Sequence, residues 1–180
     1  MINITENFLL SLVVIAQIII VIYIVGFFVR KKNPESAFVK TLSENGFLLA
    51  FLVALVSTAG SLYYSDIRGF EPCKFCWFQR IFMYPQALLL GISLYRKEYF
   101  MKTYGIILSV IGALIALNHV YLQWSGTSII PCSAVGQSIS CSKVFVTHLG
   151  YITIPFMALV AFVLIILSLT FWKAPTEKNY

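Results

Sequence analysis

The sequence predicts an all-α protein, a polytopic helical bundle that lies in a membrane. Of the 180 residues, 59% are hydrophobic and only 11% are charged, and the mean hydropathy is +0.87. A soluble domain is about half apolar and about one quarter charged. This chain has too little polar surface to cover a soluble globule, so its helices are expected to pack against one another within lipid.

Five segments approach the roughly 20 apolar residues that a helix needs to cross the hydrocarbon of a bilayer. In chain order they are Phe8–Val29, Gly46–Ser65, Cys76–Tyr95, Thr103–Trp124 and Gly150–Trp172. The third reaches full length only if it begins near Cys76. The first is not expected to be a signal peptide, because no Lys or Arg precedes it and its apolar run is too long.

These segments divide the chain into three parts. Residues 1–45 are predicted to form an N-terminal transmembrane helix followed by a solvated linker over residues 31–45. Residues 46–172 are predicted to form a four-helix membrane domain, and residues 173–180 a short tail.

The distribution of Lys and Arg predicts the orientation in the membrane. Nine basic residues lie on one side: Arg30, Lys31, Lys32, Lys40, Arg96, Lys97, Lys102, Lys173 and Lys178. Four lie on the other: Arg68, Lys74, Arg80 and Lys143. The side richer in basic residues is expected to be cytoplasmic, so the N-terminus lies outside and the C-terminus inside. The net charge of +6 is thus attributed to topology and not to nucleic-acid binding.

All four cysteines fall on the predicted outer face, where the oxidising environment allows disulfides to persist. They are Cys73, Cys76, Cys132 and Cys141. Of the three possible pairings, the local one is favoured, Cys73 with Cys76 and Cys132 with Cys141. Two structural disulfides would satisfy this pattern. A zinc site of four thiolates is disfavoured, because eight residues separate the second pair and zinc sites use shorter spacings.

A third interpretation, a redox-active dithiol, is favoured by the stretch PCKFCWFQR at residues 72–80. A C-x-x-C thiol can have a lowered pKa, especially at a helix N-terminus or beside a cation. Pro72 suits the first turn of a helix. Arg80 is four residues after Cys76, so it is expected to stabilise a Cys76 thiolate; its alternative role is an interfacial anchor. Trp77 stands where covalent haem attachment would need His.

A second polar feature lies near the outer end of the fourth segment, in LNHVYLQW at residues 117–124. His119 has an ordinary role available in interhelical hydrogen bonding. Ionisable groups at membrane depth are nonetheless candidates for function. Arg80, His119 and Gln79 would place hydrogen-bond donors in apolar surroundings, which suits an amphiphilic carbonyl compound such as a quinone.

Several of these motifs together resemble one family. The strings are PCKFCWFQRIFMYP, NHVYLQ, IPC-x8-C and LGYITIPFMAL, in that order along the chain. They resemble the disulfide bond formation protein B family, most closely its short forms, over roughly residues 46–172. A C-x-x-C motif alone is a weak signal, whereas the ordered set is a strong one.

The resemblance implies an enzyme, a protein dithiol:quinone oxidoreductase of the bacterial cytoplasmic membrane. Such a membrane thiol oxidase reoxidises a thioredoxin-like extracytoplasmic disulfide donor of the DsbA type and passes the electrons to ubiquinone or menaquinone. It implies that Cys132 forms the mixed disulfide with that partner and that Cys73 exchanges with the Cys132–Cys141 pair. It further implies that Cys76 faces the quinone as a thiolate, with Arg80 and His119 beside it.

Two alternatives and one departure from the family stay open. A vitamin K epoxide reductase-like enzyme also couples a membrane C-x-x-C to a quinone, but there the loop cysteines precede the C-x-x-C motif. A non-enzymatic membrane subunit with two structural disulfides would lose only stability in a Cys73→Ser variant. Family members usually have four helices, so Phe8–Val29 is an addition whose role no motif defines.

Overall fold

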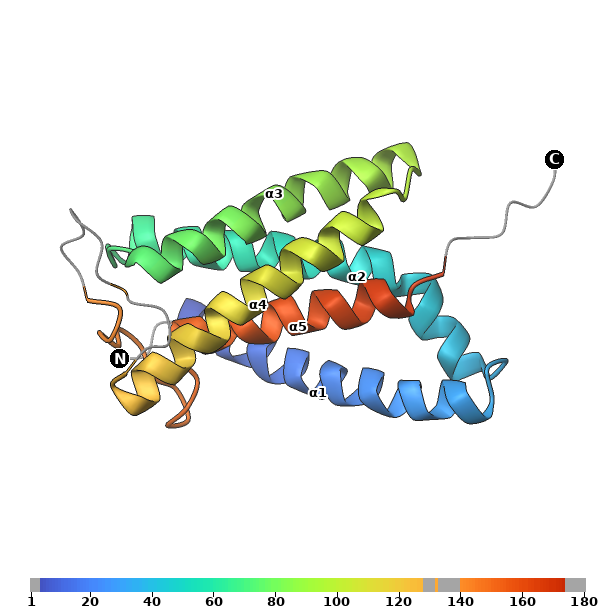
Figure 1. Cartoon of the computed structure of the whole chain (residues 1–180), viewed down its shortest axis with the longest axis horizontal. Helices are drawn as coiled ribbons and strands as arrows, with labels where there is room; N and C mark the ends of the chain where they lie inside the picture. The colour runs from blue at the N-terminus through green and yellow to red at the C-terminus, as the bar shows by residue number, and fades with distance from the viewer. Residues whose placement is uncertain (1–3, 128–131, 133–139, 174–180) are drawn as a thin grey trace.

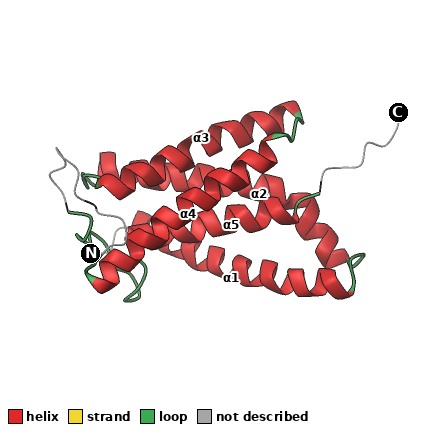
Figure 2. Ribbon diagram, in the orientation of Figure 1, coloured by secondary structure: helices red, strands yellow, loops and turns green. Residues whose placement is uncertain are grey.

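The computed structural model describes residues 4–127, 132 and 140–173. The predicted tail beyond Lys173 and the centre of the loop between Cys132 and Cys141 lie outside the described residues. Five α-helices run back and forth along one direction, and no strand forms within the described ranges (Figures 1 and 2). They are α1 (Ile4–Lys32), α2 (Ala37–Leu62), α3 (Lys74–Arg96), α4 (Met101–Ser125) and α5 (Ile154–Phe171). The all-α prediction, with one helix added to a four-helix core, is confirmed.

Helices α1, α2, α4 and α5 are long and apolar enough to cross a membrane. Helix α3 has a comparable length, 23 residues, but a more polar composition. The start of α3 and the end of α4 lie at the same end of the bundle as the start of α1 (Figure 1). The chain is therefore a multi-pass membrane protein whose two cysteine-bearing segments share one end.

The predicted solvated linker is wrong over most of its length. Helix α1 continues to Lys32 and α2 already begins at Ala37. The Ser36 hydroxyl accepts a hydrogen bond from the Val39 amide at 3.4 Å and so caps α2. Val39 is only 3% exposed, so this polar-looking stretch is held as helix by tertiary packing. Hydropathy alone marks the part of a helix in hydrocarbon and misses the part that extends beyond it.

Helix α5 lies at the centre and packs against α1, α2 and α4. The main core gathers buried side chains from α2, α3, α4 and α5: Phe47, Ala50, Ala54, Met83, Leu90, Ala116, Ala161, Phe162, Ile165 and Leu169. Small residues let helices approach closely in membranes. At Gly112 of α4 the approach is so close that a Cβ atom would overlap the Phe162 ring of α5.

The chain between α2 and α3 brings the C-x-x-C motif to the end of the bundle. The last turn of α2 widens into a short π-helix, η1 (Tyr63–Ile67). Gly69 then adopts a positive φ of 67°, which glycine accommodates without steric cost. Cys73 is the N-cap of α3, so Pro72 lies just before the helix and not in its first turn as predicted. Cys73 and Cys76 nevertheless lie at the two ends of the first turn of α3, as expected.

Candidate redox site

The two cysteines of the C-x-x-C motif lie side by side at the start of α3. Their sulfur atoms are 3.2 Å apart and share a hydrogen bond, and both are free thiols in this structure. The Cys73 carbonyl accepts the Trp77 amide at 3.1 Å, which closes the first helical turn around the motif. Cys73 is 3% exposed, whereas Cys76 is only partly buried. The predicted proximity of this pair is present, without the predicted bond.

Cys132 and Cys141 form a disulfide with their Cα atoms 6.2 Å apart, which confirms the other half of the local pairing. Cys141 is 1% exposed and belongs to the same buried cluster as Cys73, together with Phe75 and Leu122. Cys132 is only half-buried. The second pair therefore packs against the first through Cys141 and presents Cys132 as its more accessible member.

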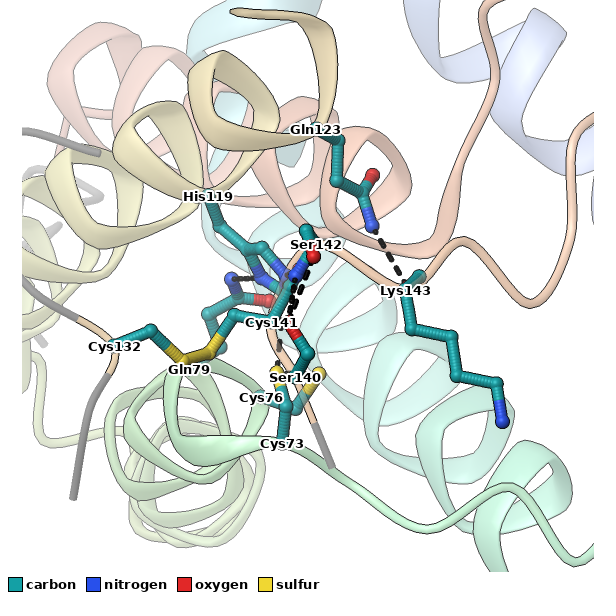
Figure 3. The surroundings of a disulfide bond; sticks show 10 residues. All are labelled: Cys73, Cys76, Gln79, His119, Gln123, Cys132, Ser140, Cys141, Ser142 and Lys143. Carbon is teal, nitrogen blue, oxygen red and sulfur yellow. Dashed lines mark hydrogen bonds between the residues drawn. A yellow bond between two sulfur atoms is a disulfide. The ribbon is translucent and has the colours of Figure 1, made fainter. Parts of the chain in front are cut away.

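His119 of α4 points toward both cysteine pairs (Figure 3). Its Nε2 atom is 3.0 Å from the Cys141 carbonyl oxygen and 3.7 Å from the Cys73 sulfur. Its Nδ1 atom is 3.2 Å from the Gln79 Nε2 atom. Since the Gln79 amide donates to Nδ1, the ring proton is on Nε2. That N–H donates to the Cys141 carbonyl and is directed at the same time toward the Cys73 sulfur.

The surroundings of Cys73, which lies just before α3, favour its thiolate. The hydrogen bond with Cys76 is the largest influence and lowers the pKa of Cys73 to about 4. Burial opposes this shift, while the hydrogen bond with His119 adds to it. A thiolate is the form that attacks disulfides, so this pair is poised for thiol–disulfide exchange.

A cavity of about 320 Å³ opens on the other side of Cys76. Apolar side chains of α1, α2, α3 and α5 form most of its walls. Its polar lining includes Ser57, Ser61, Tyr64, Glu71, Gln79, Arg80 and Tyr84. Neither Cys73 nor His119 is among the described residues that line it; both border a separate cleft of about 20 Å³ that Cys76 also reaches. Cys76 is thus placed between the buried cysteine cluster and the cavity.

Arg80 is held at this cavity by α2. Its Nε atom donates to the Ser61 hydroxyl at 3.1 Å, and its Nη2 atom donates to the Ser61 carbonyl at 3.3 Å. The Tyr84 hydroxyl donates to the Ser61 hydroxyl oxygen at 3.1 Å. The Arg80 guanidinium lies 5.3 Å from the Trp77 ring centre. These contacts fix the cation inside the protein, which argues against the anchor alternative.

The predicted site residues separate into two groups. Cys73 and Cys141 belong to the buried cluster, and His119 contacts both of them. Gln79 contacts His119 and also lines the cavity. Arg80 lies on the cavity side, whereas His119, expected beside the same ligand, does not border the cavity. Sequence reasoning missed Ser61, Tyr64 and Tyr84. Tyr84 follows Arg80 by four residues, so helical spacing could have identified it.

The fold and the site define a polytopic membrane protein with two adjacent cysteine pairs, one of them bonded and the other free. The family model for disulfide bond formation protein DsbB matches residues 43–172. The chain belongs to this family, and its role is therefore that of an oxidoreductase in disulfide bond formation, acting with a thiol partner.

Several curated relatives agree with this assignment. Disulfide bond formation protein C of Bacillus subtilis is 43% identical over 130 residues, which cover 72% of this chain and 92% of that protein. A probable disulfide formation protein C of Bacillus cereus is 40% identical over 68% of this chain and 87% of its own. A probable disulfide formation protein of Metapseudomonas resinovorans is 41% identical over 76% and 93%. No solved structure matches the chain.

Proposed function

We propose that this protein is a membrane thiol oxidase that transfers electrons from an extracytoplasmic dithiol protein to a membrane quinone. One observation carries the proposal. Cys73 and Cys76 lie between a disulfide on one side and an apolar cavity on the other, and Cys76 contributes to the cavity wall. A relay from a water-side partner to a lipid-side acceptor needs this order of groups.

In the first step, a thioredoxin-like partner of the DsbA type donates its two thiols. One partner thiolate attacks Cys132, which breaks the Cys132–Cys141 bond and releases Cys141 as a thiolate. The second partner thiolate then attacks the mixed disulfide. The partner leaves oxidised, and the second pair holds two electrons and two protons. The greater exposure of Cys132 supports its role as the attacked sulfur.

In the second step, Cys141 attacks Cys73 of an oxidised Cys73–Cys76 pair and displaces Cys76 as a thiolate. Cys132 then attacks Cys141, which restores the Cys132–Cys141 disulfide and releases Cys73. The products are a bonded second pair and a free first pair, the combination found in this structure. The Nε2–H of His119 is positioned to stabilise the departing Cys73 thiolate.

The cavity beside Cys76 fits a quinone. Its apolar walls and volume suit a ring compound, and Arg80 and Gln79 provide hydrogen-bond donors at its polar end. When bound there, a quinone would accept the two electrons and two protons of the first pair. Arg80 would stabilise negative charge on the cavity side of Cys76. Gln79 would connect the cavity with His119 through their hydrogen bond.

The proposed orientation places the cysteine pairs outside the cytoplasm of a bacterial cell. Arg30, Lys31 and Lys32 form the last turn of α1, at the end of the bundle away from the cysteines. Arg96 and Lys97 end α3 at that same end (Figure 1). Basic residues concentrate on the cytoplasmic side of membrane proteins, so the partner would approach from the outside.

A single-turnover experiment tests the quinone step. Purified protein with the first pair reduced is mixed with one equivalent of a quinone without oxygen. We expect one hydroquinone to form and the thiols of Cys73 and Cys76 to disappear together. A Cys76→Ser variant should form none. Loss of the thiols without hydroquinone formation, or no reaction in the unmodified protein, would reject the quinone as acceptor.

A further inference from the structure

Helix α1 lies outside the family domain, because the matched region begins at residue 43 and α1 ends at Lys32. Much of α1 faces outward, as expected for a helix added at the edge of a bundle. Phe8, Ile18, Phe27 and Phe28 are among its exposed apolar side chains. A helix with no further role would need only enough contact with α5 and α2 to stay in place.

One face of α1 nevertheless forms a wall of the cavity that contains Cys76. Its lining residues are Leu9, Leu12, Val13, Ile15, Ala16 and Ile19. Most of these positions recur at intervals of three and four residues, so they lie along one helix face. This face is entirely apolar, whereas the donors Arg80 and Gln79 come from α3. The cavity therefore has a polar end on the family domain and an apolar side on α1.

Two polar contacts fix α1 relative to the cysteine-bearing segments. The Glu6 carboxylate forms an ion pair with Arg68 at 2.9 Å, and Arg68 lies in the segment that leads to Cys73. The Tyr151 hydroxyl donates to the Gln17 Oε1 atom at 3.2 Å, and Tyr151 lies in the segment between Cys141 and α5. Such contacts align α1 with the redox site, which a helix serving only as an anchor does not need.

Tyr64 supplies an independent sign of a ligand. It lines the cavity and is 5% exposed, and its hydroxyl has no hydrogen-bond partner among the described residues. A buried hydroxyl without a partner is costly, so such groups are normally satisfied. Tyr64 lies one helical turn after Ser61, the residue that holds Arg80. A ligand with two separated oxygen atoms, bound beside Arg80, would give this hydroxyl an acceptor.

We propose that α1 is the tail-binding wall of the quinone site. The prenyl tail of a lipid quinone lies along the face from Leu9 to Ile19, and a ring oxygen accepts a hydrogen bond from Tyr64. This inference rests on the proposed function and adds to it. The family domain carries the groups that react, and α1 confers preference for quinones with a long tail.

Photolabelling tests the location of the tail directly. The full-length protein is incubated with a prenylquinone that carries a diazirine on its tail, irradiated and digested with trypsin. Because residues 1–29 contain no Lys or Arg, α1 is recovered almost whole in the single peptide 1–30. We expect this peptide to be labelled, and excess long-tailed quinone to prevent labelling. Absence of label on this peptide, or equal competition by phospholipid, would overturn the inference and indicate a lipid site.

A pair of α1 variants tests the preference for a tail. Ala16→Phe would place a large side chain in the cavity and reduce its volume. Ile18→Phe changes a side chain that is 56% exposed and does not line the cavity. For Ala16→Phe we expect the KM for a long-tailed quinone to rise about tenfold, with little change for a tail-less quinone. Equal KM values for Ala16→Phe and Ile18→Phe would contradict the inference. If the unmodified protein reduces no quinone, the proposed function is wrong. Photolabelling still tests separately whether the quinone tail lies along α1.

A Tyr64→Phe variant tests the hydroxyl. The affinity for both long-tailed and tail-less quinones should fall about fivefold, as for loss of one hydrogen bond. The melting temperature without quinone should not fall, because the hydroxyl has no partner in the protein. An unchanged affinity would show that the Tyr64 hydroxyl does not contact the quinone. A lowered melting temperature would show that the hydroxyl has a structural role.

Discussion

The sulfur of Cys73 lies 3.7 Å from the Nε2 atom of His119 within a buried cluster. The same nitrogen is 3.0 Å from the carbonyl oxygen of Cys141, a member of the second cysteine pair. One imidazole therefore contacts both pairs. Because Gln79 holds the other ring nitrogen, the ring is fixed in the tautomer that donates toward the sulfur. This arrangement stabilises a thiolate where exchange between the pairs must occur.

His119→Ala should raise the pKa of Cys73. The pKa is lowered to about 4, chiefly by Cys76 and also by His119, so the thiolate persists as the pH falls until about pH 4. Without the imidazole, we expect the apparent pKa to rise by about one unit or more. The ultraviolet absorbance of the thiolate, followed from pH 8 to pH 3, measures this. Gln123→Ala, one turn further along α4, is the control, and identical titrations of the two variants would contradict the role of His119.

Cys141→Ala should trap the partner on Cys132. The remaining Cys132 is the more accessible sulfur, and removal of Cys141 leaves no internal thiol to restore the original bond. When this variant is mixed with a thioredoxin-like donor in its disulfide form, the Cys132 thiolate breaks the donor disulfide and bonds to one donor cysteine. This disulfide-linked complex should therefore accumulate on non-reducing gels. The matched variant Cys132→Ala should accumulate much less, because Cys141 is only 1% exposed. The reverse pattern would assign the partner to Cys141.

Arg80→Lys should impair quinone reduction although it keeps the positive charge. A lysine cannot make both hydrogen bonds to Ser61 and also stack on Trp77. We expect kcat/KM for the quinone to fall about 10- to 100-fold, as for loss of a preorganised charge. Arg96→Lys, at the far end of α3, should react like the unmodified protein. Equal rates in the two variants would show that Arg80 has no role at the cavity.

Gly112→Ala should destabilise the bundle. The added Cβ atom would overlap the Phe162 ring, and overpacking of a tight core costs about 1–3 kcal/mol. The melting temperature in detergent should therefore fall. Leu114→Ala, at a 61% exposed position two residues further on, is the control. A melting temperature of Gly112→Ala equal to that of the control would show that α4 and α5 can separate locally at little cost.

Much of the fold could be predicted because the membrane imposes long apolar helices. Five segments and one shared end for the cysteines followed from hydropathy and the positions of Lys and Arg. The prediction of a solvated linker was wrong because a cap at Ser36 and burial of Val39 hold residues 37–45 in α2. Hydropathy detects neither feature.

The site could be predicted only in part. Helical spacing predicted that Cys76 and Arg80 share one face of α3, and both line the cavity. It could not indicate that Ser61 of α2 holds the guanidinium. Both His119 and Gln79 were identified, yet their contact depends on how α3 and α4 pack. The cavity wall on α1 was not predicted at all, because no local motif distinguishes its inner face from its outer one.

Donor-coupled quinone reduction tests the electron relay through both cysteine pairs. The purified protein, with all four cysteines intact, is supplied with a reduced thioredoxin-like donor and a membrane quinone in the absence of oxygen. We expect each donor dithiol oxidised to yield one hydroquinone, and Cys73→Ser and Cys132→Ser each to abolish the coupled reaction. Donor oxidation without hydroquinone, or turnover that persists in either variant, would contradict a relay through both pairs.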